Sequence, residues 1–426
     1  MIGEKIHSFA RKLWPINRSI TGEGVRETLR QIKTHIPNLA IKSVPSGTKV
    51  FDWTVPKEWF VNKAYIITPK GKKICNFSEN NLHLVGYSSP FDGDLSLDEL
   101  KDHLYTIPEQ PNAIPYVTSY YEERWGFCLS QNEFDKLEDG IYRIKIDSKL
   151  FNGELNYGEI RIPGKKNKEI FLSTYICHPS MANNELSGPV VVTFLVKWLQ
   201  ELSDLEFSYR IIFIPETIGS ITYLSLNLKE MKKNIISGFN VSCVGDNRAY
   251  SFLPSREGNT ISDHVAKHVL KWIDPDFVKY TWFDRGSDER QYCAPGVNLP
   301  IASIFRTKHG KYPEYHTSLD NLENVVTPEG LKGGYLMLKR ALELFEKNKN
   351  YIVTVLGEPQ MGKRGLRPTL SDNKMEKQMF LMMDFISLCD GKNSLISIAD
   401  QLKCPAWDLY KIVDELISHN LIVESS

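Results

Sequence analysis

Uninterrupted runs of hydrophobic residues alternate with stretches of helical periodicity in the second half of the chain. The runs predict strands near 169–177, 207–215, 236–245 and 299–306, and the periodic stretches predict helices near 187–203, 219–233, 260–273 and 328–348. Strands that alternate with helices pair in parallel, and helices then cover both faces of the sheet. We therefore expect an α/β domain built as a three-layer sheet of mainly parallel strands.

The first part of the chain follows different patterns. Helical periodicity covers residues 4–35, with breaks near Pro15 and Gly22. Beyond it, short alternating runs such as 59–67 predict strands, and only 95–103 predicts a helix. This region therefore has the pattern of a mostly β unit.

These patterns divide the chain into four parts. We interpret residues 43–158 as an inserted, mostly β domain within a discontinuous domain that consists of 1–42 and 159–350. Residues 351–373 are rich in Gly and Pro and predict a linker. Residues 374–426 contain amphipathic helices and predict a winged-helix-like domain.

The C-terminal helices bear on the choice of partner. The pattern predicts helices at 395–402 and 405–419, joined by the short turn of a helix-turn-helix. The second helix carries more acidic than basic residues: Asp408, Asp414 and Glu415 against Lys411. Phosphate binding requires clustered Lys and Arg, so this helix argues against nucleic acid. We expect this helix to pack on the core or on another subunit. The sequence therefore keeps a homo-oligomer as one alternative.

Composition excludes little and favours an ordinary globular protein. The 426 residues include 52 basic and 52 acidic ones, and this balance does not favour nucleic acid or an anionic membrane as a partner. The seven cysteines form no CxxC pair, which is typical of a reducing compartment. The sequence predicts neither a signal peptide nor a membrane-spanning segment, so we expect a cytoplasmic location.

Three of the predicted strands end next to a residue that can bind a metal. His178 follows the first strand, Glu216 the second and Asp246 the third. The carboxyl ends of parallel strands meet at one edge of a sheet, where sites form. An imidazole and two carboxylates are zinc ligands. The first hypothesis is therefore a metal-dependent hydrolase.

Each of these residues also has a structural interpretation. A single histidine at a strand end is more often structural, and an aspartate there suits a turn. Glu216 is placed to act as a general base, or as the acidic partner of a helix N-terminus. Asn184 offers an oxygen ligand, but it is equally suited to cap the next helix.

Two polar loops supply further candidates. His316 lies in a loop before the last helix of the core, where Asp320 can orient its second ring nitrogen or start that helix. The segment 284–292 is dense in charge, and we interpret it as a substrate-contact loop or as a solvated face. The candidate substrate-pocket residues are Asp288, Glu289, Arg290 and Tyr315.

The order of these motifs resembles that of a known superfamily. The motifs are His178, then Asn184-Glu185-Leu186-Ser187-Gly188, Pro215-Glu216, Asp246 after a strand, and Tyr315-His316-Thr317. The chain resembles zinc aminopeptidases of the bacterial leucyl aminopeptidase and glutamate carboxypeptidase type. More closely, it resembles aminopeptidase-like bacterial proteins associated with polysaccharide biosynthesis. The resemblance covers nearly the whole chain and implies an aminopeptidase-like domain, an inserted β domain and a C-terminal winged helix.

The resemblance also implies roles for single residues. His178 and Asp246 match ligands of a first zinc ion, His316 matches a ligand of a second, and Glu216 matches the general base. Asn184 stands where the superfamily has the aspartate that bridges two zinc ions, and Thr217 where a glutamate binds the second. Because two negative charges are missing, we expect one zinc ion, held by His178 and Asp246 with Asn184 or His316.

Three hypotheses follow. The first is a zinc-dependent aminopeptidase-like hydrolase that cleaves an amide bond at an N-terminus or in a small acylated amine, with Glu216 as the base. The second is a catalytically degenerate protein that binds a saccharide or peptide in the same cleft. The third is a winged-helix regulator.

Overall fold

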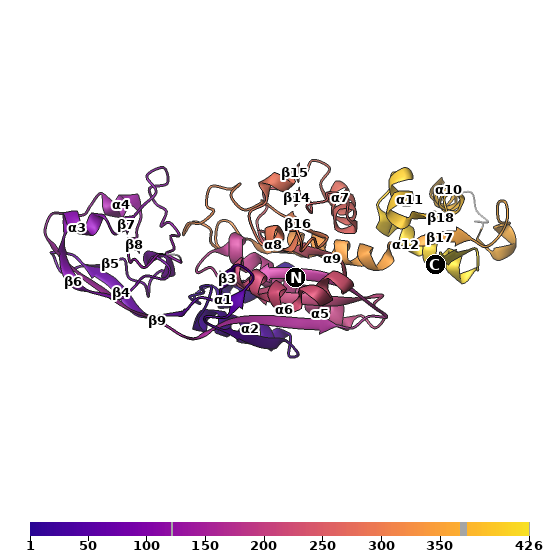
Figure 1. Cartoon of the computed structure of the whole chain (residues 1–426). Helices are drawn as coiled ribbons and strands as arrows, with labels where there is room; N and C mark the ends of the chain where they lie inside the picture. The colour runs from indigo at the N-terminus through magenta and orange to yellow at the C-terminus, as the bar shows by residue number, and fades with distance from the viewer. Residues whose placement is uncertain (121, 367–372, 426) are drawn as a thin grey trace. The chain divides into compact units, whose positions relative to one another are not determined.

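The computed structural model describes residues 1–120, 122–366 and 373–425 (Figure 1). The chain divides into two compact units. One consists of Met1–Ser262 and Val278–Leu336, and the other of Asp263–Phe277 and Met337–Ser426.

The main sheet of the first unit confirms the predicted α/β architecture. Its strand order is β1-β10-β12-β11-β13-β16-β14-β15, and β12, β11, β13 and β16 are parallel neighbours. The strands are β1 (Ala40–Pro45), β10 (Glu154–Ile162), β11 (Lys166–Tyr175), β12 (Phe207–Ile214), β13 (Ile235–Asn240), β14 (Ser251–Leu253), β15 (Val278–Lys279) and β16 (Ile301–Phe305). The antiparallel strands β1 and β10 on one side of this parallel core were not predicted.

Helices cover both faces of the sheet. Thr174 of β11 faces α5 (Ser187–Glu201), which packs with α1 (Ile2–Leu13) and α2 (Glu23–His35). The neighbouring residue Ser173 faces the other way and hydrogen-bonds Tyr292 of α8 (Glu289–Tyr292), beside α6 (Ile218–Asn234). Because successive side chains of a strand point to opposite faces, the arrangement is a three-layer sandwich. The helices α7 (Ile261–Ile273) and α9 (Pro328–Lys347) also lie where the sequence predicts them.

The inserted region forms its own antiparallel sheet in the order β5-β4-β9-β6. Its strands are β4 (Glu58–Ile67), β5 (Lys73–Ile74), β6 (Phe91–Ser96) and β9 (Ile141–Phe151), and its smaller elements are β2 (Lys49–Val50), β3 (Trp53–Thr54), α3 (Leu97–Lys101), β7 (Leu104–Tyr105), β8 (Phe127–Cys128) and α4 (Gln131–Phe134). The predicted strand 59–67 is β4. The predicted helix 95–103 is the shorter α3, which begins at a capping box of Ser96 and Glu99.

The second unit contains the predicted helix pair. Its C-terminal part contains the helices α10 (Asn373–Ser387), α11 (Leu395–Gln401) and α12 (Ala406–Ser418), and β17 (Asn350–Val353) lies between β18 (Asp390–Ser394) and β19 (Ile422–Glu424). The strand β17 falls at the start of the predicted linker 351–373, of which 367–372 lie outside the described residues. Within this unit the ring of His268 accepts the backbone N–H of Ala406 (3.0 Å), so the first turn of α12 packs on α7.

In the part of the chain that the structure describes, no helix combines the length and the apolar character that a membrane crossing requires.

Helix α5 approaches the sheet closely because residue 188 has no side chain. A Cβ atom on Gly188 would lie 2.4 Å from Thr174 Oγ1 and 2.5 Å from the carbonyl oxygen of Val241. Both distances are far below van der Waals contact, and the carbonyl is backbone that cannot turn aside. Gly188 therefore sets the separation between α5 and the strands that carry the candidate site.

We predict that Gly188→Ala destabilises the protein by about 1–3 kcal/mol, because overpacking forces α5 away from the sheet. Gly362→Ala is the matched control, since a Cβ atom there meets nothing within 4 Å. Urea unfolding midpoints measure both. Equal midpoints for the two variants would show that the helix adjusts without strain.

Candidate functional site

The structure brings His178 and Glu216 together at the carboxyl edge of the sheet. Tyr175, the last residue of β11, pairs in parallel with Ile214, the last residue of β12. The two chains leave the sheet side by side, and His178 Nε2 lies 3.8 Å from Glu216 Oε2. This proximity follows from parallel register, as the sequence pattern predicts.

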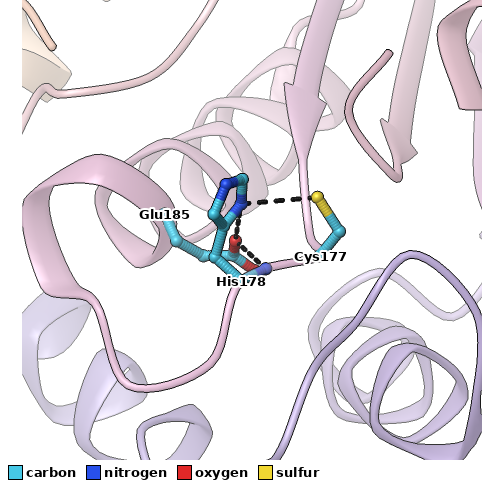
Figure 2. A group of neighbouring side chains, drawn as sticks. All are labelled: Cys177, His178 and Glu185. Atoms are coloured by element: carbon cyan, nitrogen blue, oxygen red, sulfur yellow. Dashed lines mark hydrogen bonds and ion pairs between the residues drawn. The ribbon is translucent and has the colours of Figure 1, made fainter. Parts of the chain in front are cut away.

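The other ring nitrogen of His178 faces a buried carboxylate (Figure 2). His178 Nδ1 lies 3.0 Å from Glu185 Oε2, and the same oxygen accepts the backbone N–H of His178. A carboxylate on Nδ1 selects the tautomer in which Nε2 has the free lone pair. The cleft-facing nitrogen of His178 is therefore the one that can bind a metal.

Glu185 is itself neutralised by a buried arginine. Arg18 Nε donates to Glu185 Oε1 (2.9 Å) and to the carbonyl oxygen of His178 (3.0 Å). Both charged side chains are completely buried. An uncompensated buried charge costs several kcal/mol, so each depends on the other. The sequence offered no signal for this pair, because Arg18 and Glu185 are 167 residues apart.

Cys177, His178 and Glu185 are the one group of potential metal ligands that the described residues bring within 4.8 Å of one another. Two features argue against a metal there. Burial raises the pKa of the Cys177 thiol to about 11, so it keeps its proton near neutral pH. Glu185 already accepts hydrogen bonds from Arg18 and His178. We interpret this group as the support that orients His178.

The pKa of His178 bears on metal binding. Burial lowers it, but Cys177, Tyr116 and Glu185 raise it by more, so it lies well above the ordinary histidine value. A metal at Nε2 must therefore displace a proton, and its affinity falls as the pH falls.

Asp246 does not join this group. Its Oδ2 accepts the side-chain amide of Asn183 (2.9 Å) and the N–H of Thr307 (2.9 Å), and its Oδ1 accepts the Thr307 hydroxyl (2.7 Å) and the N–H of Arg248 (2.8 Å). A carboxylate has about four lone-pair positions, and all of them are used here. Asp246 thus accepts four hydrogen bonds and acts as a structural acceptor.

Strand β13 is shorter than the predicted strand 236–245. It ends at Asn240, which pairs with Ser173, and continuing the register by two residues sets Ser242 beside Tyr175. The residue at the level of the site is therefore Ser242, and Asp246 lies on the loop beyond. An aspartate that follows a hydrophobic run does not by itself reveal where the strand ends.

Asn184 is hydrogen-bonded through both its side chain and its backbone. Its Oδ1 accepts the Tyr175 hydroxyl (2.9 Å), and its backbone N–H donates to Asp320 (3.0 Å). It lies in a single π-helical turn, Ala182–Leu186, a rare conformation that is frequent at functional sites. Asp320 binds this turn and the Tyr312 hydroxyl (2.9 Å), so it does not orient His316.

Glu216 is held by the segment that the sequence suggested as a substrate loop. Ser287 Oγ donates to Glu216 Oε1 (2.6 Å). The next residue, Asp288, accepts the N–H of Thr217 (2.7 Å) and the hydroxyl of Ser220 (2.8 Å). Thr217 has φ 61° and ψ −79°, a conformation that is rare for a residue with a side chain. Asp288 thus stabilises the sharp turn that directs Glu216 into the cleft.

The four candidate pocket residues lie in different environments. Asp288 and Glu289 are completely buried, and Glu289 accepts the N–H groups of Gly286 and Ser287. Both therefore support the site from the protein interior. Arg290 is exposed and donates to the Thr217 hydroxyl (2.8 Å). Tyr315 stacks on His316, with ring centroids 3.9 Å apart.

His316 lies close to His178. Its ring centroid is 5.6 Å from that of His178, and its Nε2 is buried without a hydrogen-bond partner. Burial lowers the pKa of His316 to about 3, and the charge of His178 adds to this effect. The imidazole is therefore neutral near pH 7, as a metal ligand must be.

Burial has the opposite effect on the carboxyl groups of the site. It raises the pKa of Glu216 above the ordinary glutamate value of 4.5, and it raises that of Asp288 to about 8. A raised carboxyl pKa near a cleft is typical of groups that exchange protons.

A cavity of about 190 Å³ opens beside these residues. The core contributes polar and apolar lining residues, and the inserted domain contributes a wall rich in aromatic and apolar groups. The lining residues are Ile20, Trp53, Thr54, Pro56, Tyr120, Cys177, His178, Glu216, Thr217 and Ile218. The cavity thus combines a candidate base with an apolar surface.

Comparisons with known proteins match this architecture. Residues 7–348 match the model of a family described as "Domain of unknown function (DUF4910)", and residues 349–424 match a winged helix-turn-helix model. A "Putative polysaccharide biosynthesis protein with aminopeptidase-like domain" from Clostridium acetobutylicum is 45% identical over 401 residues, which are 93% of this chain and 91% of that protein. The chain belongs to the DUF4910 family. The predicted C-terminal winged helix is thereby confirmed.

Solved structures confirm the predicted fold. A "putative peptidase" from Clostridium acetobutylicum has 43% identity and a TM-score of 0.93 over 99% of this chain and 96% of that one. BSAP, a zinc aminopeptidase from Bacillus subtilis, has 12% identity and a TM-score of 0.59 over 81% of this chain and 94% of its own. A "Peptidase M28 precursor" from Shewanella amazonensis has a TM-score of 0.57 with 12% identity. The last two show a shared fold.

His178 and His316 offer two imidazole donors of the kind that zinc binds. Among the described residues, His316 Nε2 has no hydrogen-bond partner, and His178 Nε2 lies 3.8 Å from Glu216 Oε2. Two imidazoles that share one ion have ring centroids about 5 Å apart if each Zn–N bond is about 2 Å, close to the 5.6 Å here. Of the remaining candidates, Asn184 and Thr217 supply no charge, and the Asp246 carboxylate already accepts four hydrogen bonds.

We predict that Arg18→Met lowers stability by about 3–5 kcal/mol, because it leaves the buried Glu185 charge without its cation. Adding Glu185→Gln removes that charge, so the double variant should be more stable than Arg18→Met alone. Urea unfolding of the single and double variants tests this. Additive losses would mean that the two side chains do not depend on each other.

Proposed function

We propose that the chain is an aminopeptidase-like hydrolase that cleaves an amide bond with the help of a single zinc ion. The observation that carries the proposal is the proximity of three groups: His178 and Glu216, which line one cavity, and His316, whose ring centroid lies 5.6 Å from that of His178. The shared fold with zinc aminopeptidases supports it.

In this proposal His178 and His316 hold the ion, and Glu216 acts as the base. When bound, zinc supplies a Lewis acid that polarises a carbonyl group and acidifies water. Glu216 takes a proton from water through Oε2, while Ser287 holds Oε1 (2.6 Å). The buried site excludes bulk water, which strengthens each of these electrostatic interactions.

The cavity also suggests the kind of substrate. Its wall from the inserted domain, which includes Trp53, Pro56 and Tyr120, favours an apolar or aromatic group next to the scissile amide. Glu216 is the one carboxylate among the described lining residues, so the cavity offers a positively charged side chain a single anion. An N-terminal apolar residue or a small acylated amine fits this surface.

A second candidate is a binding protein without hydrolytic activity. It is favoured by the neutral Asn184 and Thr217 and by the fully hydrogen-bonded Asp246, which leave few anions for a dication. The cavity would then recognise a saccharide or peptide. The two experiments below separate the candidates.

We predict that purified wild-type protein binds about one zinc ion per chain, because imidazole is a zinc ligand and two imidazoles, those of His178 and His316, lie close together. His178→Ala and His316→Ala should each lose most of it, whereas folded Asp246→Asn should retain it. Elemental analysis after dialysis against zinc measures the content. Equal zinc in His178→Ala and wild type would contradict the assignment, and a metal-free wild type would favour the binding protein.

We predict that the zinc-loaded protein hydrolyses members of a panel of aminoacyl anilides and N-acetylated amines. Glu216→Gln should reduce the rate about 100-fold or more, because a general base contributes that much. Glu27→Gln, at a half-buried glutamate on α2 that pairs with Arg30, should not change it. A wild-type protein that cleaves no member of the panel, or a fully active Glu216→Gln, would reject the mechanism.

The pH dependence of that rate has a definite sign. The base must be ionised, and burial raises the pKa of Glu216 above 4.5. The rate should therefore be full above this raised pKa and fall as the pH drops through it. A rate that rises as the pH falls would mean that the reaction requires a protonated group, and it would contradict Glu216 as the base.

A further inference from the structure

The inserted domain is joined to the loop that carries His316. Pro115 and Thr317 form an antiparallel β-bridge. The backbone N–H of Tyr116 donates to the carbonyl oxygen of His316 (2.9 Å). Main-chain pairing of this kind fixes the register of two segments.

Two further contacts extend this pairing on either side. Ile114 and Ser318 are linked twice: the Ser318 N–H donates to the Ile114 carbonyl (2.9 Å), and the Ile114 N–H donates to Ser318 Oγ (3.0 Å). The side-chain amide of Gln110 donates to the Pro313 carbonyl (2.7 Å). The insert therefore contacts the whole loop from Pro313 to Ser318.

The loop requires such support because His316 has an unfavourable backbone conformation. Its φ is 58°, in the left-handed region that side chains disfavour by about 1–2 kcal/mol. The hydrogen bond from Tyr116 holds the carbonyl of this residue. Pairing with the insert thus offsets the strain and keeps the imidazole at the cleft.

The side chain of Tyr116 contacts both histidines of the site. Its ring centroid is 5.3 Å from that of His178 and 5.1 Å from that of His316, with an edge-to-face angle of 85° to the latter. Tyr315 stacks on His316 at 3.9 Å, so His316 packs against two aromatic rings. The Tyr116 hydroxyl is 2.9 Å from that of Tyr120, which lines the cavity.

We propose that Tyr116 is a positioning residue for the two imidazoles, and that the inserted domain is therefore a working part of the site. Its backbone sets the conformation of His316, and its ring keeps the two imidazoles apart at the separation that one ion requires. The zinc-dependent part of this inference rests on the proposed function. The positioning of His316 does not.

Zinc affinity of the full-length protein, measured by competition with a chromophoric chelator, tests the first part. Tyr116→Ala should weaken zinc binding about tenfold or more, as loss of a group that orients a ligand does. Tyr116→Phe retains the ring and should bind like wild type. Tyr65→Ala is the matched control, because Tyr65 is a half-buried tyrosine of the same inserted domain whose ring contacts Lys73.

The imidazole nitrogen NMR signals of ¹⁵N-histidine-labelled protein, recorded without metal at one pH, test the second part. The His316 signals, assigned by their loss in His316→Ala, should shift or split in Tyr116→Ala and stay unchanged in Tyr116→Phe and Tyr65→Ala. Unchanged His316 signals in Tyr116→Ala would overturn the inference. If wild type binds no zinc, the proposed function fails, while the NMR comparison still decides whether Tyr116 positions His316.

Discussion

The buried carboxylate of Glu185 is the interaction on which the site depends. It is completely inaccessible to solvent. It binds Arg18 from the N-terminal segment, and it binds both the backbone N–H and the ring Nδ1 of His178. Removing a charge from water is costly, so this group stabilises the fold only while all its partners are present. It thereby ties the start of the chain, the exit of β11 and the π-helical turn to a single orientation of His178.

That orientation gives the cleft its chemistry. With Nδ1 facing Glu185, His178 presents Nε2 toward Glu216, and the parallel register of β11 and β12 sets the distance between them. Two neutral groups also lie at this edge: Asn184, which hydrogen-bonds Tyr175, and Ser242, two residues beyond the end of β13. A site with so few free anions compensates one dication better than two, which is why the proposed function uses a single ion.

Much of this could be predicted from the sequence, and the exceptions have physical reasons. The hydrophobic runs predicted the parallel strands, and the rule that parallel strands end at one edge predicted that His178 and Glu216 meet.

The role of Asp246 was hidden because its partners, Asn183 and Thr307, are more than 60 residues away on either side. Asp288 and Glu289 suggested a solvated or substrate-binding loop, since carboxylates are seldom completely buried. Backbone N–H groups donate hydrogen bonds to these buried carboxylates and so offset the cost of burying them. A sequence does not show which backbone groups will do this. The contribution of Tyr116 depends on the docking of an inserted domain, which periodicity cannot reveal.

The most direct test of the account is the position of the metal. Crystals grown with zinc and measured at the zinc absorption edge give an anomalous difference map that locates every bound ion. The account predicts one peak, next to Nε2 of both His178 and His316, with Glu216 nearby and Asp246 still bound to Thr307 and Asn183. A pair of peaks, a peak on Asp246, or a peak among Cys177, His178 Nδ1 and Glu185 would contradict it.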